Sequence, residues 1–176
     1  MPATTLSTPP CPHRQHRRWP RSIGAFGMTA ALLVGGSGAL LDRCESDPPT
    51  QRERVVQITN QRRAENGRSR LAIDSRLMRA AQKHSEYQAR NRTMTHTGSG
   101  GSSAGDRMRA EGYRWSWWGE NVAAGQNDAA SVMQAWMNSS GHRANILNSN
   151  FVHIGVGMSR ASNGVEYWTM VLGKPY

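Results

Sequence analysis

Cysteine is almost missing from this 176-residue chain, and its placement excludes several kinds of chemistry. The two cysteines, Cys11 and Cys44, both precede the segment that is patterned like a folded domain, residues 52–176. That segment therefore has no disulfide, no thiol nucleophile and no cysteine metal ligand. Its stability must come from a packed core, which roughly 120 residues can supply.

Lysine is also scarce, since only Lys83 and Lys174 stand against 20 arginines, and the formal net charge is +10. Residues 51–176 carry 17 Lys plus Arg against 9 Asp plus Glu, a net charge of +8. A strongly basic protein can attract nucleic acid, anionic lipid or an anionic cell wall. Here the arginines are scattered along the sequence, which favours a solvated basic surface and no specific nucleic-acid partner. A basic adhesion module at the cell envelope remains an alternative.

Charged residues are absent from residues 23–41, and this run follows a basic stretch with four arginines. A basic flank, an apolar centre and small residues at 37–39 predict an export signal, with cleavage after Ala39. An uncleaved membrane anchor is the alternative, because the run nearly reaches the length that spans a bilayer. We therefore expect residues 1–41 to be a signal peptide or anchor and residues 42–51 to be a linker. The protein is then expected to be secreted or otherwise extracytoplasmic, and monomeric.

Hydrophobic periodicity in residues 52–176 predicts helices first and a β-hairpin last. The helices are expected at 51–66, 75–91, 103–111 and 127–138. A strand with closely spaced glycines, Gly155 and Gly157, is followed by Asn163 and Gly164, which form a strong hairpin-turn signal. The returning strand is expected at 165–172. This order of elements predicts an α+β layered domain.

One carboxylate, Glu120, lies between the three tryptophans of residues 115–118 and a small apolar run. Burying an unpaired carboxylate is costly, so we expect Glu120 to face a water-filled cleft or to meet a cation, an imidazole or a metal. Two histidines, His96 and His142, each stand next to glycine-containing loops. Scaffolded loops often carry binding or catalytic residues, and we hypothesise that these three side chains converge.

Two neutral imidazoles and a carboxylate would make a reasonable zinc set, with His96, Glu120 and His142 as the ligands. No His-Glu-x-x-His pattern is present, which disfavours a standard metalloprotease. Residues 101–105 formally match the serine-hydrolase pattern Gly-x-Ser-x-Gly around Ser103. That pattern needs a strand leading into the turn, and the glycine-rich residues before it cannot form one.

Five short motifs occur in an order that resembles a known family. They are residues 95–98, 105–107, 119–123, 136–147 and 154–157. Across residues 55–173 they resemble a bacterial CAP or SCP domain, the superfamily of cysteine-rich secretory, antigen 5 and pathogenesis-related proteins. The resemblance implies a three-layer α-β-α sandwich with a central antiparallel sheet, and an extracytoplasmic location.

The resemblance also implies a ligand cleft formed by His96, Glu120, Asn121 and His142. Members of this family can bind a divalent cation there, for which zinc is the first choice, and eukaryotic members have been linked to sterol or fatty-acid binding. Many of those members place a second glutamate where this chain has Ser139, and they contain disulfides that this chain lacks. The expected function is binding of a cation and of a lipid or cell-wall ligand, not catalysis. A metal-assisted hydrolase with Glu120 or an imidazole as general base is the alternative.

Overall fold

The computed structural model describes residues 48–176. The signal peptide or anchor expected at residues 1–41, and most of the linker expected at 42–51, lie outside the described residues. Within them, no helix combines the length and the apolar character that crossing a bilayer requires.

The four expected helices and the closing β-hairpin are present in the predicted order, and two strands and a further helix lie among them. The elements are α1 (Gln51–Glu65), β1 (Ala72–Ile73), α2 (Ser75–Asn91), the 3-10 turn η1 (Ser99–Gly101), α3 (Ala104–Ala110), β2 (Trp115–Ala124), α4 (Ala129–Asn138), α5 (Ser140–Leu147), β3 (His153–Arg160) and β4 (Glu166–Pro175). Side chains that accept main-chain N–H groups define where the helices begin. Thr50 caps α1, Asp74 caps α2, Ser103 caps α3 and Asp128 caps α4.

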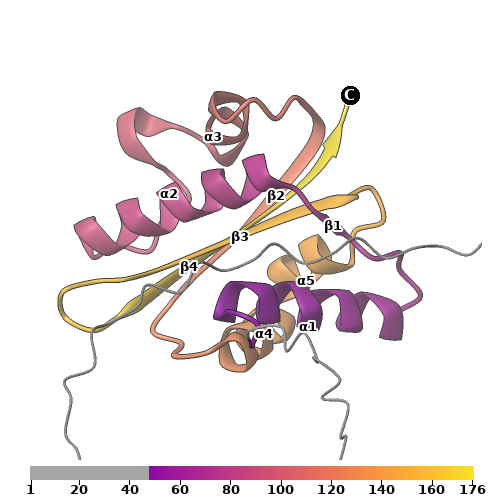
Figure 1. Ribbon diagram of the computed structural model, residues 1–176, viewed down its shortest axis with the longest axis horizontal. Coiled ribbons are helices and arrows are strands. Elements are labelled where there is room, and N and C mark those ends of the chain that lie inside the picture. Colours follow the sequence, from indigo (N-terminus) through magenta and orange to yellow (C-terminus); the bar gives the residue numbers. More distant parts are fainter. Residues whose placement is uncertain (1–47) are drawn as a thin grey trace, which may run out of the picture. The chain divides into compact units, whose positions relative to one another are not determined.

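The four strands form one sheet in the order β1-β3-β4-β2. β4 pairs antiparallel with both β2 and β3, whereas the short β1 runs parallel to β3, so the expected antiparallel sheet is a mixed one. Helices α2 and α3 cover one face of the sheet and α1, α4 and α5 cover the other (Figure 1). The α-β-α sandwich is thereby confirmed. β2 lies at one end of the sheet and has a single strand neighbour.

The two faces of the sheet are packed differently. On the α1, α4 and α5 side, large side chains such as Trp136, Ile146 and Trp168 build the main core. On the other side, α2 lies directly against the main chain of β3. A Cβ atom added to Gly155 would lie 2.1 Å from the Leu77 carbonyl carbon, closer than any real contact. Glycine is therefore required at Gly155 and Gly157 of β3, because any side chain there would collide with the main chain of α2.

The two longest stretches without a predicted element are regular structure. The tryptophan-rich segment is the ten-residue strand β2, which has a bulge between Trp115 and Trp117. The segment that was expected to be a loop delivering His142 is the helix α5. Isolated propensity disfavours a helix that contains Gly141, but α5 is stabilised by burying Ile146 in the main core.

Candidate functional site

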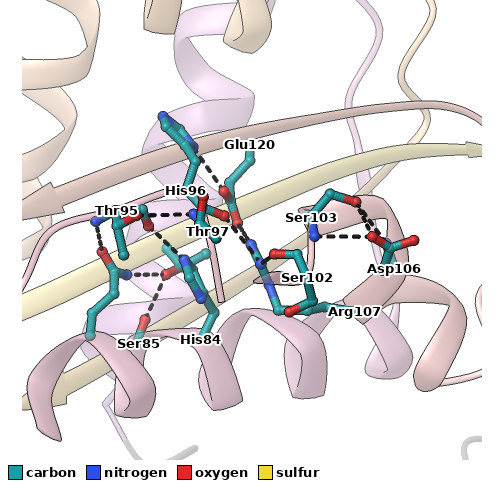
Figure 2. Close-up of polar contacts among 12 residues, drawn as sticks. His84, Ser85, Thr95, His96, Thr97, Ser102, Ser103, Asp106, Arg107 and Glu120 are labelled. Carbon is teal, nitrogen blue, oxygen red and sulfur yellow. Dashed lines mark hydrogen bonds and ion pairs between the residues drawn. The ribbon is translucent and has the colours of Figure 1, made fainter. Parts of the chain in front are cut away.

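Glu120 is placed by β2 with its side chain almost fully buried, at 2% exposure. Its Oε1 is 2.8 Å from Nδ1 of His96, and its Oε2 accepts a hydrogen bond from Nη2 of Arg107 at 2.5 Å (Figure 2). The buried carboxylate thus meets an imidazole and a guanidinium. These two partners compensate for the desolvation that would otherwise make its burial costly.

His96 follows α2 on a segment that is held in place by buried polar side chains of that helix. The Thr95 carbonyl lies 2.7 Å from Nε2 of His84, and the Thr95 N–H donates to Oε1 of Gln88 at 3.1 Å. Figure 2 shows the contact between His84 and Thr95 beneath the His96 ring. The hydrogen bond to Glu120 raises the pKa of His96, and burial opposes the shift. The ring is 60% exposed, and with Nδ1 facing Glu120 its other nitrogen, Nε2, is left for a ligand.

Arg107, on α3, is the site residue that sequence reasoning missed. Besides its bond to Glu120, its Nη1 donates to the Ser102 carbonyl at 2.7 Å and to the His96 carbonyl at 3.2 Å. The side chain is only 12% exposed. A Cβ on Gly98 would lie 2.8 Å from Nη1, so the glycine makes room for the guanidinium. One arginine thus ties the His96 loop, α3 and β2 together.

Asn121 and His142 belong to the opposite layer, on the α5 side of β2. The Asn121 side chain is buried, and its Nδ2 donates to the His142 carbonyl at 3.1 Å. Its Oδ1 accepts from Asn145 at 2.9 Å. Asn121 therefore anchors the start of α5 and does not offer its amide to a ligand. Burial lowers the pKa of His142, and the nearby His96 lowers it further.

The three proposed zinc ligands do not fit a three-ligand site in this arrangement. Both carboxylate oxygens of Glu120 are already hydrogen-bonded, one to His96 and the other to Arg107. The imidazoles of His96 and His142 are then the two remaining metal ligands. Across residues 48–176, there is no group of three or more His, Cys, Asp or Glu side chains that could hold a metal ion. Glu120 instead orients His96 through the ring nitrogen that faces the protein interior.

Ser103 is not arranged as a hydrolase nucleophile. Its hydroxyl donates to Oδ2 of Asp106 at 2.6 Å and accepts from the Asp106 N–H, so Ser103 caps α3 (Figure 2). The 3-10 turn η1 precedes it in place of the strand that a nucleophile elbow requires. The Gly-x-Ser-x-Gly match is therefore accidental.

A cavity of about 440 Å³ lies over these residues, and we call it the cleft. Its walls are two segments, one at 96–104 and the other at 118–120 on β2, and Asn145 of α5 closes one side. His142 lies near the cleft but does not line it. A larger hollow of about 660 Å³ lies over α1 and α4, but its ion pair, Arg62 with Glu65, is exposed. The buried charges therefore mark the smaller cavity as the candidate site.

The fold is that of a CAP domain. The model of the cysteine-rich secretory protein family, CAP, matches residues 56–172, and the chain belongs to this family. It is 41% identical over 105 residues to the uncharacterized protein YkwD of Bacillus subtilis strain 168, which covers 60% of this chain and 41% of YkwD. It is 30% identical over 122 residues to the uncharacterized membrane protein YlbC of the same organism, covering 68% of this chain and 35% of YlbC. The chain thus spans well under half the length of these two relatives.

Solved structures show the same fold. An extracellular protein containing a SCP domain from Bacillus anthracis matches with a TM-score of 0.64 and 27% identity, covering 73% of this chain and 45% of that one. An outer surface protein from Borrelia burgdorferi matches with a TM-score of 0.66 and 22% identity, covering 73% of this chain and 97% of that one.

Proposed function

We propose that this chain is an extracytoplasmic binding protein of the CAP family whose cleft receives a component of the cell envelope. The basic stretch followed by an uncharged run at residues 23–41 supports export. The extracellular and outer-surface locations in the names of the two structural relatives support the same location. The net positive charge would favour retention at an anionic envelope.

One observation carries the binding proposal. The exposed imidazole of His96 lines a cavity and is hydrogen-bonded to the buried carboxylate of Glu120, which also pairs with Arg107. Desolvating the charges of Glu120 and Arg107 costs several kcal/mol per ion before their attraction is counted. A fold gains little stability from such a pair, but the pair fixes His96 with its Nε2 free for a ligand. Trp118, at 37% exposure, adds an apolar surface to the same cavity. A polar group and an aromatic face are what a small ligand needs for orientation and affinity.

The test is a titration of the full chain with solubilised cell-wall fragments, followed by NMR and calorimetry. We expect His96→Ala and Trp118→Ala each to weaken binding about tenfold, since each removes roughly 1.4 kcal/mol of contact. Trp117→Ala is the matched control, because Trp117 is 55% exposed but does not line the cleft. Lipid vesicles and zinc chloride form parallel arms for the lipid and cation hypotheses. Equal affinity in all three variants, or no binding in any arm, would remove the proposal.

A hydrolase is the second candidate, favoured by the same His96–Glu120 hydrogen bond. A carboxylate that holds one imidazole nitrogen leaves the other as a general base, which can take a proton from water as the water attacks an ester or amide carbonyl. The proton would then pass to the leaving group. We expect any turnover of ester or peptide substrates to vanish in His96→Ala and to fall strongly in Glu120→Gln. Turnover that is unchanged in both variants would come from a contaminant and would exclude this candidate.

A further inference from the structure

β2 is an edge strand whose outer side is only partly covered. The Glu120 carbonyl accepts a hydrogen bond from Nδ2 of Asn145 at 3.2 Å, and the Val122 carbonyl accepts one from Nε1 of Trp136 at 3.1 Å. Side chains of α4 and α5 therefore occupy this end of the edge. The free N–H and C=O groups of an exposed edge strand can pair with another chain, and proteins normally prevent this by covering or interrupting the edge.

The main chain of Trp118 faces the same outer side. Main-chain groups of an antiparallel strand alternate in direction with a period of two, so Trp118 must point the same way as Glu120. β4 gives independent evidence, because the carbonyl of Gly173, the partner of Trp118, accepts a hydrogen bond from the Val152 N–H on the side away from β2. Among residues 48–176, no side chain hydrogen-bonds the Trp118 main chain. Within the described residues the outward-facing main-chain groups of Trp118 are therefore unpaired, and the residue is 37% exposed.

The cleft borders this stretch of the β2 edge, because it is lined by residues 118–120 and by Asn145, whose amide bonds the outward-facing Glu120 carbonyl. Residues 118–120 of β2 form one wall, and the segment 96–104 forms the other. The rings of Trp117 and Trp118 are both exposed, and they belong to successive residues whose side chains leave opposite faces of the strand. An edge with free main-chain groups beside an exposed aromatic ring suits an extended peptide, whose own N–H and C=O groups can pair with the strand.

We infer that the cleft binds a short extended peptide that pairs with β2 at Trp118 as an added strand and passes His96. About three residues, at about 3.3 Å each, would span the wall from Trp118 to Glu120. The main-chain bonds would supply affinity, and the Trp118 ring would contact the peptide side chain beside it. The inference rests on the proposed function and gives the ligand its chemical class.

The experiment uses the full chain and a defined probe, the peptide set acetyl-Ala-Ala-Xaa-Ala-Ala-amide with each residue type at the centre. NMR and hydrogen exchange follow the Trp118 N–H during titration. We expect the tightest peptide to protect this N–H from exchange. Its copy with methylated amides at alternate positions should bind at least about fivefold more weakly, because a main-chain hydrogen bond is lost. This comparison leaves the protein unchanged, so it cannot be confused with misfolding.

A matched pair of variants tests the protein side of the same bond. Trp118→Ala removes the ring and keeps the N–H, whereas Trp118→Pro also removes the N–H, which an outward-facing edge position tolerates. We expect Trp118→Pro to bind the peptide at least about fivefold more weakly than Trp118→Ala, with equal urea midpoints. Equal affinity of the two variants, or peptide binding without protection of Trp118, would overturn the inference.

Two other outcomes would overturn the peptide but not the cleft. Cell-wall fragments without peptide that shift His96 resonances, while no member of the peptide set binds, would retain the proposed function and reject this ligand class. Protection of the Trp118 N–H that rises with protein concentration alone, together with dimers in sedimentation, would assign the edge to a second copy of this chain.

Discussion

Replacing Arg107 with methionine tests whether its buried ion pair with Glu120 holds the walls of the cleft together. Nη2 of Arg107 lies 2.5 Å from the carboxylate, and the two side chains are 12% and 2% exposed. Methionine fills similar space but leaves Oε2 of Glu120 without its partner. Breaking a buried pair by removing one member costs about 3–5 kcal/mol, because the remaining charge stays desolvated.

Neighbouring contacts place the expected loss within that range. Arg107→Met also deletes the bonds to the carbonyls of Ser102 and His96, each of which contributes about 1 kcal/mol. Against this, Glu120 keeps its bond to His96, and water can enter from the adjoining cleft. We therefore expect a loss of about 4 kcal/mol, which is a large fraction of the about 5–15 kcal/mol typical of a domain.

Urea unfolding measures this loss as a fall in the midpoint at constant slope. Arg62→Met is the matched control, because Arg62 pairs with Glu65 at 2.9 Å while both side chains are more than 40% exposed. That exposed pair should contribute no more than about 1 kcal/mol. The double variant Arg107→Met, Glu120→Gln should recover part of the loss, since no unpaired charge remains. A loss below about 1 kcal/mol in Arg107→Met, equal to that of the control, would show that the buried ion pair does not hold the walls of the cleft together.

Three further measurements address packing, titration and metal binding. Gly155→Ala should cost at least about 3 kcal/mol in urea unfolding, because its Cβ would meet the α2 main chain at 2.1 Å, whereas Gly141→Ala, with nothing within 4 Å, should be neutral or stabilising. In an NMR titration His96 should lose its proton at a higher pH than His142, and the reverse order of the two titrations would contradict the assigned contacts. The stabilisation that comes from the raised pKa of His96 is present below about pH 6.5 and is lost as the pH rises through the pKa of the folded state. Calorimetry with zinc should show binding weaker than micromolar, and the affinity should increase in Arg107→Met because this variant frees Oε2 of Glu120 to coordinate the metal. Tight zinc binding to the unaltered chain would show that the ion pair does not keep Glu120 from acting as a metal ligand.

Helical periodicity and turn signals were enough to predict most of the fold. α1, α2, α3 and α4 were predicted because each buries a stripe or begins at a capping side chain, and the β3–β4 turn because Asn163 and Gly164 favour it. β2 was not predicted because its tryptophans and Glu120 show no simple alternation. Its bulge shifts the register near Trp115, and both of its faces are covered over much of its length.

The site was only partly predictable for a different reason. Glu120 and His96 stand out as polar residues in unusual surroundings, and the structure brings them together. Arg107 is one of 20 arginines, and although residues 105–107 are one of the five family-like motifs, the charge pattern alone does not distinguish a buried ion-pair partner from a solvated helix residue. Asn121 stands in the strand beside Glu120, and only the packing of α5 shows that its amide faces inward. Long-range partners decide such roles, and the sequence does not specify them.

The packing of α2 against β3 also determines how rigid the cleft is. Because Gly155 and Gly157 admit the helix main chain itself, α2 has little freedom to slide relative to the sheet. Its buried side chains His84 and Gln88 hold both main-chain groups of Thr95, one residue before His96. The position of the imidazole is therefore set by a helix-to-sheet contact on the same face as Glu120. A ligand that binds the imidazole of His96 therefore loses its own conformational entropy, but little free energy is spent on ordering the protein. This saving allows a measurable affinity with only a few contacts.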